Sequence, residues 1–280
     1  MQAALNGSGM DDGGEQMITS VTNARIKHIQ LLAKKAKARR EEGLFLVEGP
    51  RMFFEAPVER IERAYLSESF YGEMEDRAIL DRISWELVAD RVFAQAAETV
   101  HSQGVLCIMR AMGYGLSELL RKDDPLLLLL EDLQDPGNVG TIFRTAEGAG
   151  VDGIILTKNC VDIYNPKTIR STMGSVYRMP FVCLGDGDLS PVLDCLRERG
   201  VDTCAAHLQG NCVYDREDYT GGTMFLIGNE GNGLSDGLSA SADKKVRIPM
   251  EGCLESLNAG VAAAVLMYEA YRQRRRARER

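Results

Sequence analysis

The chain has 280 residues, of which 45% are hydrophobic and 26% charged, as expected for a globular protein with one large or two modest domains. It has no run of 18 apolar residues that would predict a membrane-spanning helix. Its formal net charge of -8 excludes a uniformly basic surface, so any contact with nucleic acid must come from local basic segments.

The first 16 residues have neither the basic segment nor the apolar segment of a signal peptide. We expect them to form a disordered tail. Met17 could be the natural start, so the sequence leaves open whether residues 1–16 belong to the native protein.

The stretch from residue 16 to residue 40 carries seven basic residues and no acidic one. Apolar residues at Ile26, Ile29 and Leu32 predict a helix over residues 22–40, which Thr22 or Asn23 could cap. Basic residues clustered in this way suit phosphate binding, although they could equally form a solvated helix face. The residues that we predict to bind RNA are Arg25, Lys34, Lys35, Lys37, Arg39 and Arg40.

Short apolar runs alternate with helical stretches up to residue 110, and this alternation predicts a small α/β domain over residues 17–110. The predicted strands are 44–47, 61–66, 85–88 and 105–109, and the further predicted helices are 51–56 and 91–97. Glycines and a charge cluster then predict a linker over residues 111–124.

A larger α/β pattern covers residues 125–280. Its first strand, residues 126–130, consists of five leucines and is typical of a parallel sheet buried on both faces. The other predicted strands are 153–156, 180–184, 201–206, 224–227 and 245–248. The predicted helices run from the Pro-Gly-Asn turn to residue 145 and over 166–171, 190–199 and 257–275. The chain ends in a basic segment, residues 272–280, with six arginines and one glutamate.

The first of three motifs lies at residues 130–150, where a strand ends at acidic residues and a turn leads into a helix. A helix N-terminus favours anions, and Gly140 allows a close backbone approach. Arg144, six residues after Asn138, could hold a phosphate bidentately. A capped core helix with a surface arginine fits the same residues. The segment lacks both the Gly-Lys-Ser/Thr of a P-loop and the third glycine of a dinucleotide-binding fingerprint.

Two further motifs follow. Residues 225–235 predict an apolar strand followed by a loop with three glycines, and the backbone of that loop could wrap a ligand. Glu230 is the only acidic residue within residues 225–235. An ordinary tight turn is the alternative. Residues 246–274 form a strand, a short loop and a helix that begins near Ser256-Leu257-Asn258, and Ser256 could simply be the helix N-cap.

Cysteine and histidine usage favours a reduced, cytoplasmic protein without a metal site. The seven cysteines are odd in number and show no Cys-x-x-Cys spacing, and most lie in apolar runs. The three histidines are not paired at helical spacing.

Taken together, the three motifs resemble the SpoU/TrmH family of RNA ribose 2′-O-methyltransferases. The matching residues are Asn138-x-Gly140 with Arg144, then Gly228-Asn229-Glu230-Gly231, then Ile248-Pro249-Met250 with Glu255-Ser256-Leu257-Asn258. The resemblance covers residues 125–275. The stretch from Ile18 to Arg51 separately resembles the L30e-like substrate-binding domain that often precedes the catalytic domain in this family.

The resemblance implies a SPOUT domain with a mostly parallel sheet and a deep trefoil knot, which binds S-adenosylmethionine in its knotted loops. The cofactor-binding residues that it implies are Gly228, Ile248, Leu257, Met250 and Leu208. The catalytic residues that it implies are Arg144, Asn138, Glu230, Ser256 and Asn258. It also implies a homodimer whose partner subunit completes the site, with Val261, Val265, Leu266 and Tyr268 of the last helix in the interface.

The sequence leaves the role of Arg144 open. In the family the matching arginine is proposed to act as the base, but a guanidinium is normally always protonated. Arg144 could instead hold the phosphate and stabilise the developing alkoxide.

The substrate implied by the resemblance is structured RNA, with 23S rRNA favoured and tRNA as the alternative. An RNA-binding module of the same fold without catalysis is a second alternative, and a nucleotide-dependent oxidoreductase is a third that lacks its glycine fingerprint. The sequence does not separate housekeeping modification from methylation that confers antibiotic resistance.

Overall fold

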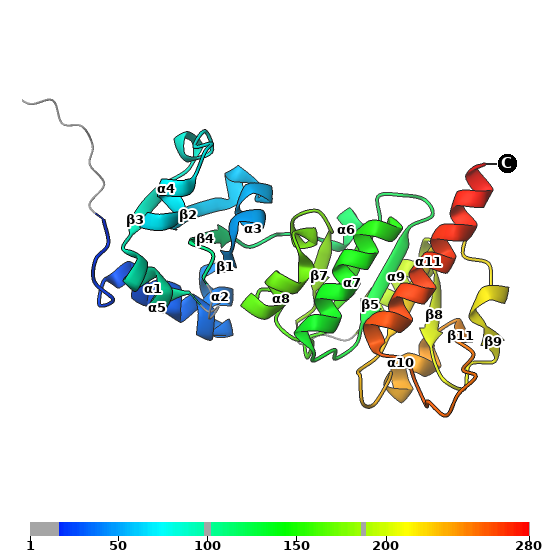
Figure 1. Ribbon diagram of the computed structural model, residues 1–280. Helices are drawn as coiled ribbons and strands as arrows, with labels where there is room; N and C mark the ends of the chain where they lie inside the picture. Colours follow the sequence, from blue (N-terminus) through cyan, green and yellow to red (C-terminus); the bar gives the residue numbers. More distant parts are fainter. Residues whose placement is uncertain (1–16, 98–101, 186–188, 280) are drawn as a thin grey trace, which may run out of the picture.

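The computed structural model describes residues 17–97, 102–185 and 189–279, so the tail expected over residues 1–16 lies outside the described residues. Figure 1 shows two groups of elements side by side, each built around its own sheet. The strands of the first group come from residues 44–110, and those of the second come from residues 126–247.

The first sheet has four strands in the order β1-β4-β2-β3. Strand β4 pairs antiparallel with β1 and β2, whereas β3 pairs parallel with β2. The strands are β1 (Leu44–Glu48), β2 (Ile61–Ser67), β3 (Trp85–Val88) and β4 (Val105–Arg110). The helices are α1 (Ala24–Lys34), α2 (Ala36–Glu42), α3 (Pro50–Glu55), α4 (Glu68–Glu73) and α5 (Asp90–Ala96), with short 3-10 turns η1 (Val58–Arg60) and η2 (Leu80–Arg82).

The single helix predicted over residues 22–40 is wrong, because the chain forms two helices there. Lys35 separates α1 from α2 and has an extended backbone, with φ -118° and ψ 102°. No glycine or proline marks the break. Its physical reason is Arg39, which turns inward and donates from Nη1 to the carbonyl oxygens of Leu32 and Ala33 at the end of α1.

The second sheet has seven strands in the order β7-β6-β5-β10-β8-β11-β9, and every neighbouring pair is parallel. The strands are β5 (Leu126–Leu130), β6 (Gly153–Leu156), β7 (Phe181–Cys183), β8 (Asp202–Ala206), β9 (Cys212–Val213), β10 (Thr223–Ile227) and β11 (Lys244–Arg247). The helices are α6 (Leu116–Leu119), α7 (Pro136–Ala149), α8 (Pro166–Thr172), α9 (Ser190–Glu198), α10 (Asp236–Ser241) and α11 (Ala259–Arg278), with 3-10 turns η3 (Ser175–Tyr177) and η4 (Tyr214–Arg216). The predicted strands and helices of this half agree with these bounds to within about one helical turn.

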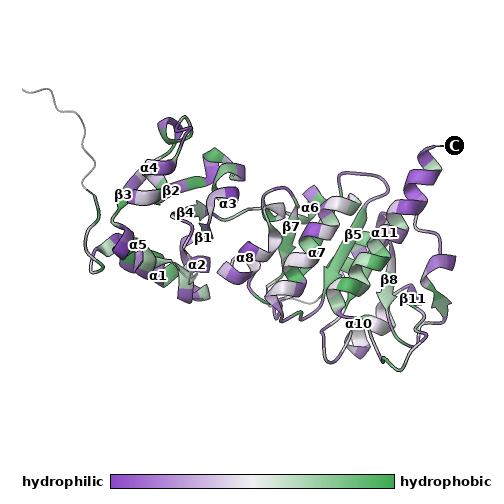
Figure 2. Ribbon diagram, in the orientation of Figure 1, coloured by the Kyte–Doolittle hydropathy of each residue, from purple (hydrophilic) through white to green (hydrophobic). Residues whose placement is uncertain are grey.

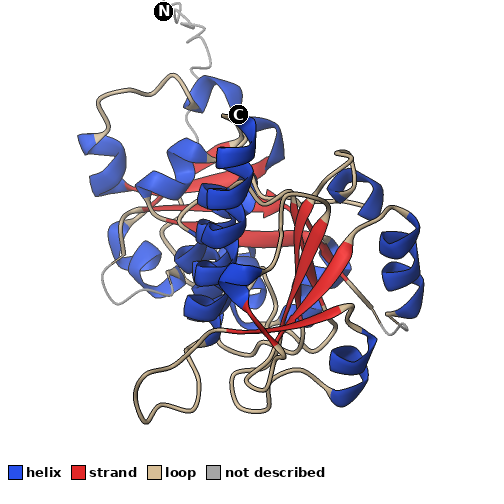
Figure 3. Ribbon diagram, turned by 90° about the vertical axis from the view of Figure 1, so that its right-hand side faces the viewer, coloured by secondary structure: helices blue, strands red, loops and turns tan. Residues whose placement is uncertain are grey.

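The five leucines of β5 explain why helices cover both faces of this sheet. Alternate side chains of a strand point to opposite faces. Leu126, Leu128 and Leu130 belong to the core that includes α7 and α11, whereas Leu127 and Leu129 pack with α6, α9 and α10. Figure 3 shows helices on both sides of this sheet, and Figure 2 shows that its central strands are hydrophobic along their length. The sheet is therefore buried on both faces, as the leucine run predicts.

The segment predicted as a linker, residues 111–124, is packed against the second group. It contains the short helix α6, and Leu119 and Leu120 are buried. The hydroxyl of Tyr164 accepts a hydrogen bond from the Met112 backbone N–H at 2.7 Å and donates to its carbonyl oxygen at 3.2 Å. The segment is therefore held in place by contacts with the second group.

The C-terminal part of the sheet has an unusual order. Strand β11 lies between β8 and β9, which are joined directly by residues 207–211. A Cβ atom on Gly210 in that connection would lie 2.7 Å from the carbonyl carbon of Val246, so the connection passes directly over β11. This is the arrangement that a threaded chain needs, and the deep trefoil knot itself stays a prediction.

Candidate functional site

A cavity of about 440 Å³ lies where the loops after β8, β10 and β11 meet the start of α11. Ligand sites in parallel α/β sheets form at this edge, beyond the carboxyl ends of the strands. All five residues predicted to bind the cofactor line it, together with Glu230 and Ser256. The predicted cofactor residues are Leu208, Gly228, Ile248, Met250 and Leu257.

The loop after β10 has a shape that requires glycine. Asn229 and Gly233 exchange two backbone hydrogen bonds, of 3.0 and 2.9 Å, which close the loop on itself. A Cβ atom on Gly228 would lie 2.1 Å from the carbonyl carbon of Gly233, which leaves no room for any side chain. The Asn229 side-chain oxygen accepts from the backbone N–H groups of Gly231 and Asn232, at 2.9 and 3.1 Å. The loop therefore presents mainly backbone to the cavity.

Three predicted catalytic residues from the three sequence motifs form one hydrogen-bonded chain. Asn258 donates from Nδ2 to Oδ1 of Asn138 at 2.8 Å, and Asn138 donates from Nδ2 to Oε1 of Glu230 at 3.0 Å. Glu230 also accepts from the backbone N–H groups of Gln134 and Asp135, at 3.2 and 3.1 Å. Side chains 92 and 120 residues apart in the sequence are thereby held in one place.

These hydrogen bonds determine the charge state of Glu230. Partial burial works against its ionised form, but the donated hydrogen bonds of Asn138, Gln134 and Asp135 outweigh burial and hold the pKa of Glu230 below its ordinary value. Glu230 is therefore a stable carboxylate at neutral pH on the wall of the cavity.

Asn258 also begins the last helix. Its Oδ1 accepts from the backbone N–H groups of Gly260 and Val261, at 2.9 and 3.3 Å, while its Nδ2 contacts Asn138. The alternative reading of Ser256 as the helix N-cap is wrong, because Asn258 takes that position. Ser256 is exposed and lies on the cavity wall.

The structure does not bring Arg144 into the cavity of its own chain. Arg144 is exposed on α7 and forms no hydrogen bond or ion pair with any residue in the described ranges. A Cβ atom on Gly148 would lie 3.3 Å from the Tyr268 hydroxyl, and one on Gly260 would lie 3.5 Å from Cγ2 of Thr141. Arg144 follows Thr141 by three residues and precedes Gly148 by four, so it lies on the same face of α7, beside α11.

Several residues that organise the site were not predicted. Asp132 has a left-handed backbone, with φ 55°, and its carboxylate accepts from Thr157 Oγ1 at 2.7 Å and Asn159 Nδ2 at 3.1 Å. Its carbonyl oxygen accepts from Asn229 Nδ2 at 2.8 Å, which ties the loop after β5 to the glycine loop. Left-handed backbone on a residue other than glycine often marks a functional site.

A second link between the same two loops runs through Glu131, whose carboxylate accepts from the N–H and hydroxyl of Ser235 at 2.7 and 2.6 Å. The acidic pair after the leucine run was visible in the sequence, but its partners lie about 100 residues away.

Of the six residues predicted to bind RNA, five are exposed and one is not. The exposed residues are Arg25, Lys34, Lys35, Lys37 and Arg40. Arg39 is only 4% exposed, and its guanidinium donates to Asp162 and to two backbone carbonyl oxygens. A guanidinium occupied inside the protein is not available to a phosphate, so the prediction for Arg39 is wrong.

None of the helices in the described ranges combines the length and the apolar character needed to cross a membrane. Residues 17–97, 102–185 and 189–279 also contain no group of three or more histidine, cysteine or acidic side chains arranged to hold a metal ion.

Comparison with known proteins gives matches along most of the chain. Residues 125–268 match the SpoU rRNA Methylase family, and residues 23–107 match the MRM3-like substrate binding domain. The 23S rRNA (guanosine(2553)-2′-O)-methyltransferase RlmP of Bacillus subtilis is 30% identical over 256 residues, which are 90% of this chain and 98% of that protein. The 23S rRNA (uridine(2479)-2′-O)-methyltransferase of Streptomyces viridochromogenes is 30% identical over 264 residues, 90% of this chain and 91% of that protein.

Solved structures agree with this assignment. The SpoU methyltransferase AviRb from Streptomyces viridochromogenes, in complex with AdoMet, aligns with a TM-score of 0.79 at 30% identity and covers 90% of this chain and 98% of its own. The AdoMet-bound rRNA methyltransferase from Sinorhizobium meliloti aligns with a TM-score of 0.81 at 28% identity, covering 92% of this chain and 97% of its own. The resemblance that the three motifs carry is thus confirmed over residues 125–268, and the separate resemblance of the N-terminal part to a substrate-binding domain is confirmed over residues 23–107. The chain belongs to the SpoU rRNA methylase family.

Proposed function

We propose that this protein transfers a methyl group from S-adenosylmethionine to a ribose 2′-hydroxyl of 23S rRNA. The observation that carries this proposal is that residues from all three sequence motifs meet at one place in the fold. The cavity of the glycine loop and the chain Glu230–Asn138–Asn258 form one continuous site. Two relatives that match nine-tenths of this chain carry 23S rRNA 2′-O-methyltransferase in their names.

The cavity suits S-adenosylmethionine in size and charge. Its volume of about 440 Å³ lies in the range of small-molecule sites. No lysine or arginine is among its described lining residues, and Glu230 supplies a negative charge opposite to that of the sulfonium. The residues that would hold the cofactor are Gly228, Leu208, Ile248, Met250 and Leu257. When bound, this group supplies a methyl group that is already activated for transfer.

The work left to the protein is alignment and charge stabilisation. Correct placement of the ribose oxygen can contribute up to about 10 kcal/mol. We infer that Asn138 and Asn258 fix the substrate side of the site, while Glu230 holds the loops through Gln134 and Asp135. Arg144 would bind the phosphate beside the target ribose and stabilise negative charge on its oxygen as the proton leaves.

Because Arg144 lies outside the cavity of its own chain, we propose that it completes the site of a second subunit. We therefore include a homodimer in the proposal. Val261 and Tyr268 of α11 are 48% and 49% exposed beside the Arg144 face of α7 and would form part of the interface. Leu266, also expected there, is fully buried within its own chain and is withdrawn from that prediction.

The alternatives differ in substrate or in the loss of catalysis. A tRNA substrate would use the same site, and several relatives carry tRNA/rRNA methyltransferase in their names. A binding module without catalysis is disfavoured because the polar network is complete, whereas a decayed site would have lost members.

A 23S rRNA substrate also implies action in the cytoplasm, in line with the cysteine pattern.

Mapping of 2′-O-methyl groups in 23S rRNA and tRNA from a deletion strain tests the substrate. The proposal predicts that one 2′-O-methyl group disappears from 23S rRNA and returns when the intact gene is restored. Loss of a tRNA methyl group with unchanged rRNA would overturn the rRNA assignment, and no loss in either RNA would support the binding module.

A further inference from the structure

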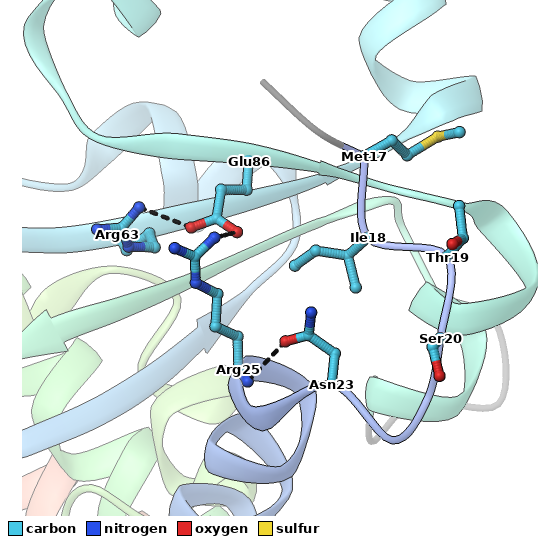
Figure 4. A pocket seen from close by; sticks show the side chains of 8 residues that line it. All are labelled: Met17, Ile18, Thr19, Ser20, Asn23, Arg25, Arg63 and Glu86. Atoms are coloured by element: carbon cyan, nitrogen blue, oxygen red, sulfur yellow. Dashed lines mark hydrogen bonds and ion pairs between the residues drawn. The ribbon is translucent and has the colours of Figure 1, made fainter. Parts of the chain in front are cut away.

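A second cavity, of about 530 Å³, lies in the first group of elements, far from the cofactor site in the fold. Its described lining comes from the segment Met17–Ser20, the start of α1, and strands β2 and β3. The charged residues that line it are Arg25, Arg63 and Glu86. Figure 4 shows the guanidinium groups of both arginines turned toward the Glu86 carboxylate.

The carboxylate of Glu86 lies beneath the two arginines. Glu86 is 4% exposed, and its Oε1 accepts from Nη1 of Arg63 at 2.6 Å. Its Oε2 forms an ion pair with Nη1 of Arg25. The side chains of Arg25 and Arg63 remain 52% and 37% exposed. A buried carboxylate thus holds two accessible guanidinium groups in fixed orientations.

The surrounding backbone makes this a built site. Asn23 caps α1 and accepts from the backbone N–H of Arg25 at 2.8 Å, so both ends of the arginine are held. Ile18 exchanges backbone hydrogen bonds with the β3 segment, through Leu87 O at 2.8 Å and Ala89 N at 3.0 Å. The walls of the cavity are therefore set before any ligand binds.

The charge balance of the cavity points to an anion. Two guanidinium groups against one carboxylate leave a net positive charge. The other guanidinium N–H groups of both arginines make no hydrogen bond with described residues. The N-terminus of α1 adds a partial positive charge. A guanidinium presents its donors in a fork that matches a phosphate.

We propose that this cavity binds a phosphodiester group of the RNA substrate, held by Arg25 and Arg63 and with Glu86 as their positioning residue. The proposal rests on the function proposed above, because that function supplies the RNA. It adds Arg63 and Glu86, which no basic sequence cluster predicts. Arg25 lies nine residues before Lys34 on α1, about 14 Å along the helix. The cavity and the exposed lysines would therefore lie at the two ends of one basic track.

The test compares the binding of an unmodified 23S rRNA transcript to the full-length protein over a series of KCl concentrations. Arg25→Gln and Arg63→Gln should each weaken binding about tenfold. Each should also lower the slope of log K against log salt by about 0.7 to 0.9. Arg77→Gln is the matched control, since Arg77 is an exposed arginine of the same group that stacks on Tyr71 outside the cavity. Its slope should stay that of the wild type.

Glu86→Gln separates positioning from simple charge. If the carboxylate acted only through its charge, its loss would make the cavity more positive and strengthen RNA binding. The proposal predicts the opposite, weaker binding, because the two guanidinium groups lose the group that orients them. Thermal melting identifies any variant that fails to fold, and Arg63→Lys then serves as the milder test, with a reduced affinity but an unchanged salt slope.

The outcomes distinguish this proposal from the proposed function. If Arg25→Gln and Arg63→Gln bind RNA as Arg77→Gln does, while the wild type methylates RNA, the cavity proposal fails and the function stands. If the wild type does not methylate RNA, but Arg25→Gln and Arg63→Gln still bind RNA more weakly than Arg77→Gln does, the proposed function fails and the cavity proposal stands. Calorimetry could also show that inorganic phosphate binds only when both arginines are present. If RNA affinity is unaffected by the loss of these arginines, that result would overturn the assignment of the cavity to RNA.

Discussion

The buried guanidinium of Arg39 and the half-buried carboxylate of Asp162 form an ion pair that joins the two groups of elements. Nη2 and Nε of Arg39 donate to one carboxylate oxygen of Asp162, at 2.6 and 2.9 Å. The pair has further support nearby, where the rings of Phe45 and Tyr164 lie 4.6 Å apart and Tyr177 donates from its hydroxyl to the Met52 carbonyl oxygen at 3.1 Å. The domain expected to bind RNA is therefore fixed against the catalytic half.

The same contact leads toward the cofactor site. Val161, next to Asp162, donates from its backbone N–H to the carbonyl oxygen of Leu133 at 2.8 Å. Leu133 precedes Gln134, whose N–H contacts Glu230. A change at the junction between the two groups can thus reach the Glu230 network through hydrogen-bonded backbone.

Asp162→Asn should destabilise the protein by about 3 kcal/mol, because it leaves a buried guanidinium without its counter-charge. Urea unfolding measures this change. Glu41→Gln, which removes an exposed helix ion pair with Lys37, is the control and should cost less than about 0.5 kcal/mol. Equal effects of the two substitutions would show that the junction contributes no more than a surface pair.

Gly228→Ala should weaken S-adenosylmethionine binding at least about tenfold, since the new Cβ atom would meet backbone atoms that cannot move aside. Gly237→Ala is the matched control, because no atom lies within 4 Å of its added Cβ. Calorimetry on both variants checks the prediction. Normal binding by Gly228→Ala would mean that the loop adopts another shape in solution.

Asn138→Asp should reduce methyl transfer more than Asn138→Ala does. The amide of Asn138 donates to Glu230 and accepts from Asn258, and a carboxylate keeps the acceptor but repels Glu230. We expect Asn138→Ala to lower the rate about 10²-fold through misalignment, and the aspartate to lower it further. Initial rates of methyl transfer at saturating cofactor test this prediction. Equal rates for the two variants would contradict the role of the hydrogen-bonded chain Glu230–Asn138–Asn258.

The contribution of Glu230 to stability should depend on pH in a defined direction. Its pKa is lower in the folded protein than in the unfolded chain, so the ionised carboxylate stabilises the fold. That stabilisation is present above the ordinary glutamate pKa of 4.5 and is lost as the pH falls through the lower pKa of the folded protein. Thermal melting of the wild type and Glu230→Gln should differ equally at pH 7 and pH 6, with a gap that narrows only below about pH 4.5. A gap that changes between pH 7 and pH 6 would mean that another group controls it.

The sequence predicted the parts of this protein whose signals are local. The leucine run of β5 fixed a buried parallel strand, and three short motifs predicted Asn138, Glu230 and Asn258 as members of one site. Both predictions rest on residue type and spacing within a few turns of chain.

The parts that escaped prediction depend on distant partners. Arg39 sits in a basic cluster and is unlike its neighbours only because Asp162 lies 123 residues away. The break at Lys35 has the same cause, since helix-forming residues continue across it. Glu86 and Arg63 lie on separate strands and meet only when β2 and β3 pair. The motif predicted Arg144 as a site residue, but the sequence did not show that Arg144 lies outside the cavity of its own chain.

The most direct test of the account is nucleoside analysis of unmodified 23S rRNA incubated with the purified protein and S-adenosylmethionine carrying a labelled methyl group. We predict label in a single 2′-O-methylnucleoside with the wild type and a large loss of label with Arg144→Ala. Label on a base, no label at all, or a normal rate for Arg144→Ala would contradict it.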